Sequence, residues 1–337
     1  MGNRKSRPAM ISLPKLHIAV LMGGSSNERE ISLMSGNGVA EALEGRGHKV
    51  TRLDLDLNIT EKLLAIKPDV VFNALHGVPG EDGSVQGMLD LMQLPYTHSG
   101  VATSAIAIDK QLTKSVLERY NIPFPQGIVL QKSTLFKEDP LPRPYVLKPL
   151  NEGSSLGVAI ISAESIYGCP ISENDEGPWK QFSTLLAEPF IKGRELTTAV
   201  IDLQDGPVAL GVTELIIEAG FYDYKHKYTE GKTIHVCPAD LPDQIRDKCE
   251  ALALKAHIHL GCRGVSRTDF RWNEELGEEG IFVLEVNTQP GMTPLSLVPE
   301  QATRKGFSYS DLVEILIYSA LQNYAPEKLQ DTGYADD

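Results

Sequence analysis

The stretch "IFVLEVNTQPGM", residues 281–292, joins a strand-like run to two polar side chains and a Pro-Gly stop. Side chains alternate faces along a strand, so positions two apart point the same way. The pattern therefore predicts one face with Phe282, Leu284 and Val286, and an opposite face with Val283, Glu285 and Asn287. A half-buried strand that shows polar groups to water would explain this stretch if it stood alone.

The run just before it, "VSRTDFRW" at residues 265–272, also alternates, and the polar, glycine-containing link "NEELGEEG" predicts a hairpin. A register that buries the apolar rows together brings four polar side chains to one common face. These are Arg267, Asp269, Glu285 and Asn287. The set gives three oxygen ligands and one guanidinium, and the oxygens suit Mg²⁺, which completes its shell with phosphate oxygens and water. The hairpin therefore predicts a metal site that works with a phosphate.

Length and composition limit the class of protein. The chain has 337 residues, which is enough for two or three domains. Its 32 Lys and Arg against 45 Asp and Glu give a net charge of −13, which argues against a nucleic-acid-binding or anionic-membrane surface. No apolar run approaches membrane-spanning length. The four cysteines form no C-x-x-C pair, which fits small hydrophobic residues in a reducing cytoplasm.

The N-terminal residues "MGNRKSRPAMISLP" are basic and lack the apolar core of a signal peptide. They match the M-G-x-x-x-[ST] myristoylation pattern, but a disordered start is favoured because the remainder is typical of a bacterial cytosolic enzyme. Residues 1–15 and 326–337 are predicted to be tails.

Strands and helices alternate near the start of the chain, which predicts a βαβ unit with a parallel sheet. Strands are expected within 16–24, 48–56 and 68–75, and helices within 27–47 and 101–120. A strand, a loop and a second strand are expected over 145–161, followed by further strands around a turn at Gly193. Later helices are expected at 241–260 and 309–323, and the packing of 162–181 is left open.

The loop "NEGSSLG", residues 151–157, predicts an anion-binding concavity made by backbone N–H groups and hydroxyls, with Lys148 beside it. A plain hairpin loop is the alternative, and the order of residues is not that of a P-loop. Glu188 and Glu195 could accept from a nucleotide, or they could be surface carboxylates. The polar run "FYDYKHKYTEGKT", residues 221–233, predicts either a loop that closes over a site or a solvated loop.

Seven motifs occur in order along the chain: "MGGSSNEREIS", "HGVPGEDGSVQGML", "LPYTHSG", "KPLNEGSSLG", "GRELTTAVI", "GVSRTDF" and "LEVNTQPGMTPLSLVP". Together, from residue 16 to residue 325, they resemble D-alanine–D-alanine ligases of the ATP-grasp superfamily. The resemblance implies an α/β, three-domain ATP-grasp fold. An N-terminal parallel-sheet (preATP-grasp) domain is expected at 16–109, and two α+β domains that clasp ATP are expected at 110–195 and 196–325.

The family reaction joins two D-alanine molecules through an acyl phosphate and releases ADP and phosphate, for peptidoglycan precursor synthesis. The resemblance further implies two Mg²⁺ or Mn²⁺ ions and a cytoplasmic homodimer. The metal ions would bind Asp269, Glu285 and Asn287. ATP would contact Lys110, Lys148, Ser154, Ser155, Glu188, Pro189, Ile191, Glu195 and Lys227.

The amino-acid substrates are assigned by the same resemblance. Glu28 would hold the ammonium group of the first D-alanine, with His76 near its carboxylate. Arg267 and the Gly291 N–H would stabilise the oxyanion, and Ser296 would bind the carboxylate of the second D-alanine. Ser154 and Tyr228 would hydrogen-bond with Glu28 and hold the 221–233 loop over the site.

Two other functions stay open. A D-Ala-D-lactate or D-Ala-D-Ser ligase would share the fold, but Tyr228 in "KHKYTEG" goes with D-alanine as the second substrate in the family. A non-catalytic nucleotide-binding regulator is the alternative from another class. The intact set of polar residues on the hairpin, from Arg267 to Asn287, argues against it.

Overall fold

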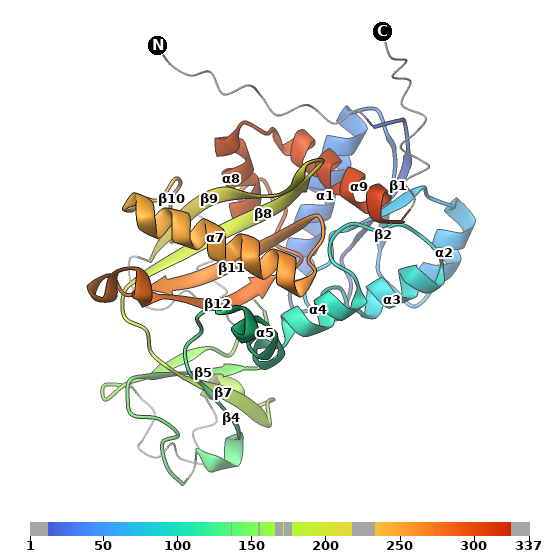
Figure 1. Cartoon of the computed structure of the whole chain (residues 1–337). Helices are drawn as coiled ribbons and strands as arrows, with labels where there is room; N and C mark the ends of the chain where they lie inside the picture. The colour runs from blue at the N-terminus through green and yellow to red at the C-terminus, as the bar shows by residue number, and fades with distance from the viewer. Residues whose placement is uncertain are drawn as a thin grey trace, which may run out of the picture.

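The computed structural model describes residues 13–135, 137–153, 156–165, 171, 177–217 and 233–324. Their strands form three sheets, with helices packed on the sheet faces (Figure 1). One sheet is parallel with three strands, and the other two are antiparallel with five and four strands. Among the described residues, no helix is long and apolar enough to cross a membrane.

The parallel sheet has the strand order β2-β1-β3. It consists of β1 (His17–Met22), β2 (Lys49–Asp54) and β3 (Val70–Asn73). Helix α1 (Arg29–Gly45) packs on one face, and α2 (Ile59–Ile66) and α3 (Ser84–Leu91) pack on the other. The predicted βαβ start is therefore confirmed, with the short helix α2 as an addition to it.

The single helix expected over 101–120 is wrong, because the chain forms two helices there. These are α4 (Val101–Ile108) and α5 (Lys110–Leu117). Asp109 lies between them in an extended conformation, and its carboxylate accepts hydrogen bonds from the amides of Gln111 and Leu112, each at 2.9 Å. This is an N-cap, which starts a new helix and places Lys110 in its first turn.

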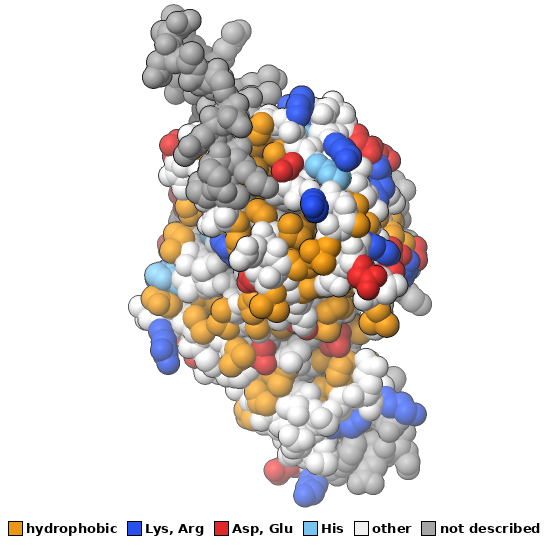
Figure 2. Space-filling view, turned by 90° about the vertical axis from the view of Figure 1, so that its right-hand side faces the viewer, with side chains coloured by type: hydrophobic (Ala, Val, Ile, Leu, Met, Phe, Trp, Pro, Cys, Tyr) orange, Lys and Arg blue, Asp and Glu red, His pale blue; other side chains and the backbone are white. Residues whose placement is uncertain are grey.

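The four-stranded sheet forms a separate lobe at the bottom of Figures 1 and 2. Its strands are β4 (Ile128–Gln131), β5 (Tyr145–Pro149), β6 (Ala159–Ile161) and β7 (Thr184–Pro189), in the order β4-β7-β5-β6. Tyr145, Leu147 and Trp179 are among the buried side chains of a core that belongs to this lobe alone. We call this lobe, residues 128–189, the small lobe.

The five-stranded sheet has the order β10-β9-β8-β11-β12. Its strands are β8 (Arg194–Leu203), β9 (Gly206–Ile217), β10 (Thr233–Val236), β11 (Val265–Trp272) and β12 (Ile281–Asn287). Helix α7 (Asp243–Leu260) covers one face, and α8 (Leu297–Lys305) and α9 (Tyr309–Tyr324) pack against the sheet as well. Short 3-10 turns lie at Glu118–Tyr120, Lys132–Thr134, Gly177–Trp179 and Glu274–Gly280.

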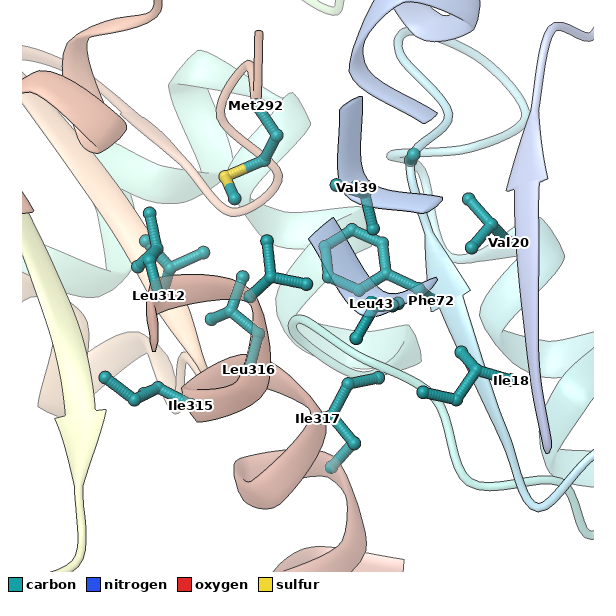
Figure 3. Close-up of a cluster of buried hydrophobic side chains, with 14 of the residues drawn as sticks. Ile18, Val20, Val39, Leu43, Phe72, Met292, Leu312, Ile315, Leu316 and Ile317 are labelled. Carbon is teal, nitrogen blue, oxygen red and sulfur yellow. The ribbon is translucent and has the colours of Figure 1, made fainter. Parts of the chain in front are cut away.

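The largest hydrophobic core of the described residues joins the parallel sheet to the five-stranded sheet. Phe72 and Leu43, from β3 and α1, lie next to Leu316 and Ile317 of α9 in Figure 3. The same core includes Val265 at the start of β11. The parallel-sheet layer and the five-stranded sheet therefore form one continuous body, which we call the main body.

A β-bulge in β12 corrects the predicted faces of the hairpin. The pairing with β11 skips Leu284, so alternation is interrupted at that residue. Val283 and Val286 are consequently both buried, and Phe282 and Leu284 are partly exposed. The expected placement of Val283 and Val286 on opposite faces is wrong, because strict alternation holds only on each side of the bulge.

Candidate functional site

A cleft lies between the small lobe and the five-stranded sheet, whose strands β8, β11 and β12 line it. It encloses about 780 Å³ of space, including the open solvent at its mouth. The small lobe contributes Val146, Lys148, Val158, Glu188 and Pro189 to its walls. The main body contributes Lys110, Glu195, Asp269, Arg271, Leu284 and Glu285.

The hairpin places its four polar side chains together, as predicted. Asp269 pairs in register with Glu285, and Arg267 pairs with Asn287. Arg267 donates to both carboxylate oxygens of Asp269, each at 2.8 Å, and the Asn287 amide donates to the same carboxylate at 3.2 Å. Thr197 on the neighbouring strand adds a 2.6 Å hydrogen bond, so Asp269 is held firmly.

The oxygens of Asp269, Glu285 and Asn287 fit a hard divalent cation by their chemistry. Two carboxylates directly opposite each other on paired strands repel, which a cation would relieve. Asn287 would have to turn its carbonyl oxygen, in place of its NH₂, towards the ion. The hairpin offers two carboxylates and one carboxamide, and the described residues contain no group of three or more His, Cys, Asp or Glu side chains that could hold a metal.

Lys148 and Glu188 form an ion pair inside the small-lobe wall of the cleft. Their charged atoms lie 2.6 Å apart, and the side chains are only 8% and 6% exposed. They lie on β5 and β7, which are adjacent in the sheet although distant in the sequence. Two of the residues predicted to contact ATP are thus together, but they bind each other in this structure.

A second ion pair lines the opposite wall, with Arg271 3.5 Å from Glu195. The Arg271 guanidinium also lies 5.5 Å from the centre of the Phe190 ring, in the link between the two sheets. Gly193 in that link has φ +125°, and a Cβ there would lie 2.0 Å from the Trp272 carbonyl oxygen. Only glycine fits at this turn, which brings Glu195 back into the cleft.

Lys110 stands where the cleft meets a second cavity. Its ammonium group donates to the Glu152 carbonyl at 2.6 Å and lies 3.4 Å from the Glu285 carboxylate. Burial raises the pKa of the Glu152 carboxyl group, and the nearby Lys110 charge acts in the opposite direction. The lysine therefore links the 150–153 loop of the small lobe to the hairpin of the main body.

Three cavities follow one another from the cleft towards the parallel sheet. The middle cavity, of about 340 Å³, shares Lys110 and Glu285 with the cleft. The third, of about 750 Å³, shares Ile108 and Gly153 with the middle one. Glu152 lines all three, so the cavities adjoin one another around this residue.

Glu28 lies at the far end of this row of cavities. A Cβ on Gly77 would lie 3.2 Å from its carboxylate, and a Cβ on Gly153 would lie 3.6 Å from it. The carboxylate is thus placed between a loop of the main body and a loop of the small lobe. Ser26 fixes the start of this turn, since its hydroxyl donates to the His76 carbonyl at 2.6 Å and accepts from the Glu28 amide at 3.1 Å.

His76 is buried beside Glu28 rather than exposed in a turn. Its ring nitrogens lie 3.2 Å from the Glu81 carboxylate and 3.3 Å from the Ser35 hydroxyl. The Ser35 hydroxyl also accepts from the Met292 amide at 3.3 Å. This contact brings the loop after β12 close to His76.

The loop after β12 contains the other two predicted substrate residues. A Cβ on Gly291 would lie 3.0 Å from the Ser296 hydroxyl, so the two residues are adjacent. Thr293 holds that hydroxyl through its amide at 3.0 Å and its own hydroxyl at 2.8 Å. Pro189 and Ile191 line the cleft.

The predicted Ser154, Ser155, Lys227 and Tyr228 lie outside the described residues. Four site residues were not predicted as such: Glu81, Glu152, Arg271 and Leu284. Arg271 is the one with a visible signal, because it continues the alternating row of Arg267 and Asp269. Leu284 reaches the cleft only through the bulge, which the alternating pattern does not reveal.

Family models match two parts of the chain. The model described as "D-ala D-ala ligase C-terminus" matches residues 118–318, and the model described as "D-ala D-ala ligase N-terminus" matches residues 54–99. A D-alanine–D-alanine ligase of Novosphingobium aromaticivorans is 63% identical over 313 residues, covering 93% of this chain and 99% of the relative. The chain belongs to the D-alanine–D-alanine ligase family.

Further relatives agree with this assignment. A D-alanine–D-alanine ligase of Zymomonas mobilis is 60% identical over 321 residues, covering 95% of this chain and 98% of the relative. The crystal structure of the Bacillus anthracis ligase complexed with ATP matches with a TM-score of 0.74 at 28% identity, covering 93% of this chain and 99% of that one. The Coxiella burnetii ligase matches with a TM-score of 0.74 at 25% identity, covering 93% of this chain and 96% of that one. The predicted family, ATP-grasp fold class and ligase class are confirmed.

Proposed function

We propose that this protein joins two D-alanine molecules to D-alanyl-D-alanine and splits ATP to ADP and phosphate in doing so. The observation that carries the proposal is the row of adjoining cavities from the cleft to Glu28, with Asp269 in the cleft and Glu285 where the cleft adjoins the middle cavity. The ammonium-binding end and the phosphate-binding end are thus joined through the residues suited to phosphoryl transfer.

The nucleotide would lie between the small lobe and the main body. Glu188 would accept from the adenine amino group, and Glu195 would accept from a ribose hydroxyl. Leu284 and Val146 provide apolar surface for the base. Lys110 and Lys148 would bind the phosphates, as point charges that neutralise the anion.

The metal assignment rests on the donor set of the hairpin. Asp269, Glu285 and Asn287 would hold Mg²⁺, or Mn²⁺, which supplies charge neutralisation and alignment of the phosphate oxygens when bound. Arg267 keeps Asp269 oriented through two hydrogen bonds of 2.8 Å. Lys110, 3.4 Å from Glu285, balances the second carboxylate.

The first D-alanine would bind with its ammonium group at Glu28 and its carboxylate near His76. An oxygen of that carboxylate attacks the terminal phosphorus of ATP, and ADP leaves. The amine of the second D-alanine, whose carboxylate binds at Ser296, then attacks the acyl carbon, and phosphate leaves with loss of one amine proton. Arg267 and the Gly291 N–H would donate to the oxygen that becomes negative in this step.

The same proposal includes two features beyond the chemistry. We expect a homodimer in the cytoplasm, as the family resemblance implies. Discrimination among D-alanine, D-serine and D-lactate as second substrate would depend on the neighbourhood of Ser296 and on Tyr228.

The test is to measure phosphate and dipeptide in one reaction of the purified protein with ATP, Mg²⁺ and D-alanine. One phosphate released for each D-alanyl-D-alanine formed is the expected result. Parallel reactions replace the second substrate with D-serine, D-lactate or L-alanine. Phosphate release that is independent of D-alanine, or a product formed only with D-lactate or D-serine, would reject the proposal.

A further inference from the structure

The ion pair between Lys148 and Glu188 conflicts with the tasks that the proposed function gives these two residues. Lys148 would have to turn to a phosphate, and Glu188 would have to turn to the adenine amino group. The pair is almost fully buried, with side chains 8% and 6% exposed. Breaking a buried ion pair leaves an uncompensated carboxylate, which is strongly unfavourable unless another cation remains nearby.

Lys114 is such a cation. It lies one turn after Lys110 on α5, and it is 4% exposed. Burial lowers the pKa of its ammonium group, the charges of Glu188 and then Glu118 act to raise it, and the charge of Lys148 acts to lower it. The two lysines and the two glutamates therefore form one electrostatic cluster.

The backbone around Lys114 also fixes the position of Glu188. The Lys114 ammonium donates a hydrogen bond to the Pro125 carbonyl, and Pro125 lines the cleft. Two residues further on, a Cβ on Gly127 would lie 2.7 Å from the Glu188 Cγ atom. The segment that Lys114 anchors thus packs directly against the stem of Glu188.

We propose that Lys114 is a positioning residue that compensates the Glu188 carboxylate and holds it in place once Lys148 turns to the phosphates, and so sets the preference for a 6-aminopurine. This inference rests on the proposed function, because it takes Glu188 as the acceptor of the amino group. The Glu188 carboxylate accepts from the amino group of ATP. The 6-oxo group of ITP is itself an acceptor and offers no donor to that carboxylate.

The experiment compares ATP with ITP in D-alanine-dependent phosphate release by wild type, Lys114→Met and Lys114→Gln. Glutamine removes the charge but can still donate to the Pro125 carbonyl, so this variant separates the effect of the charge from the effect of the hydrogen bond. It also provides a second variant if Lys114→Met fails to fold. Both variants should lower the ATP-to-ITP ratio of kcat/KM by about tenfold, mainly through KM, because a buried partner is lost. Lys114→Arg should keep most of the preference.

The matched control is Lys132→Met. Lys132 also donates to backbone carbonyls, those of Lys180 at 2.9 Å and Trp179 at 3.3 Å, but it is not part of the Glu188 cluster. It should leave the ATP-to-ITP ratio unchanged.

Three outcomes would overturn the inference. The first is an equal loss with ATP and ITP in the Lys114 variants, which would indicate a purely structural lysine. The second is an unchanged ratio in both variants, and the third is a wild type without preference for ATP. Absence of D-alanine-dependent phosphate release by the wild type with either nucleotide would instead count against the proposed function itself.

Discussion

The small lobe and the main body contribute to the same cleft, but they are stabilised in different ways. The small lobe has a core of its own around Leu147 and Trp179. The main body shares one core between its parallel-sheet layer and its five-stranded sheet, around Phe72 and Leu316. The cleft lies between the small-lobe core and a further core of the main body, around Phe270 and Val283, on β11 and β12. The comparison implies that small-lobe residues affect mainly nucleotide binding, whereas the main body supplies the remaining nucleotide contacts and the residues of the chemistry.

The largest effect is expected from Glu285→Gln in the main body. The change keeps the shape of the side chain but removes a charge from the proposed metal site, so turnover should fall by about 10²–10³-fold, comparable with loss of one oxyanion donor. Glu188→Gln in the small lobe should mainly raise the KM for ATP. Steady-state kinetics at fixed Mg²⁺ measures both.

Glu278→Gln, on the exposed link between β11 and β12, is the control and should behave like wild type. Normal turnover of Glu285→Gln would remove the metal assignment. A large fall of kcat in Glu188→Gln with an unchanged KM for ATP would show that the small lobe does not act mainly through nucleotide binding.

Two core substitutions test whether the small lobe and the main body unfold separately. Leu147→Ala in the small lobe and Leu316→Ala in the main body each remove a fully buried leucine, which costs about 2–5 kcal/mol of unfolding free energy. The chain has two tryptophans, Trp179 in the small lobe and Trp272 in the main body. Fluorescence in Trp179→Phe and Trp272→Phe backgrounds therefore reports each region separately.

We expect Leu147→Ala to shift the urea transition of Trp179 more than that of Trp272, and Leu316→Ala to do the reverse. Each tryptophan donates one hydrogen bond to a backbone carbonyl, so the two phenylalanine backgrounds are matched. Equal shifts of both reporters in both variants would mean that the molecule unfolds as one unit.

A smaller effect is expected where two loops of the main body meet. Gln289 donates to the Leu75 carbonyl and accepts from the Asn73 amide at 2.9 Å. Gln289→Leu leaves these buried groups unsatisfied, which costs about 1–3 kcal/mol. The KM for D-alanine should rise while the KM for ATP stays constant, because the linked loops lie at the amino-acid end.

Gln131→Leu is the control on the small lobe. Its amide makes an exposed 3.3 Å hydrogen bond to Thr184, so stability should change by at most about 0.5 kcal/mol. A rise of the ATP KM in Gln289→Leu, equal to that for D-alanine, would show that the two ends of the row of cavities are not independent.

The smallest effect concerns Asp54, which forms an exposed ion pair with Arg29 at the end of β2. The Arg29 guanidinium lowers the pKa of this carboxyl group from 3.8 to about 2. A lowered pKa means that the stabilisation is present above pH 3.8 and is lost as pH falls through about 2. Urea unfolding should therefore find Asp54→Asn slightly less stable than wild type at neutral pH, with the difference shrinking in acid. A difference that stays constant down to pH 2 would assign it to packing.

The hairpin is the part of the site that the sequence predicts best, because the alternation of side chains along a strand depends only on neighbouring residues. Asp269, Glu285 and Asn287 share a face in the structure as the pattern predicts. The bulge at Leu284 is not encoded in that alternation, since it depends on how β12 pairs with β11. For the same reason, Leu284 was assigned to the core instead of to the cleft.

Contacts between distant segments were not accessible in the same way. Lys148 and Glu188 meet because β5 pairs with β7, and nothing in either strand alone specifies that neighbour. Asp109 divides the predicted helix at 101–120, although aspartate followed by a helical pattern is a recognisable N-cap signal. The family resemblance pointed to residues in and around the cavities. The side chains that contact those residues could be identified only from the fold.

A crystal structure of the protein with a non-hydrolysable ATP analogue and Mg²⁺ would test the proposed ATP and metal site most directly. We expect the adenine to lie between the small lobe and the main body, with its amino group at Glu188. We also expect the terminal phosphate beside Lys110 and the ion on Asp269, Glu285 and Asn287, with Lys148 released from Glu188. A nucleotide bound outside this cleft, or an ion on other side chains, would contradict the account.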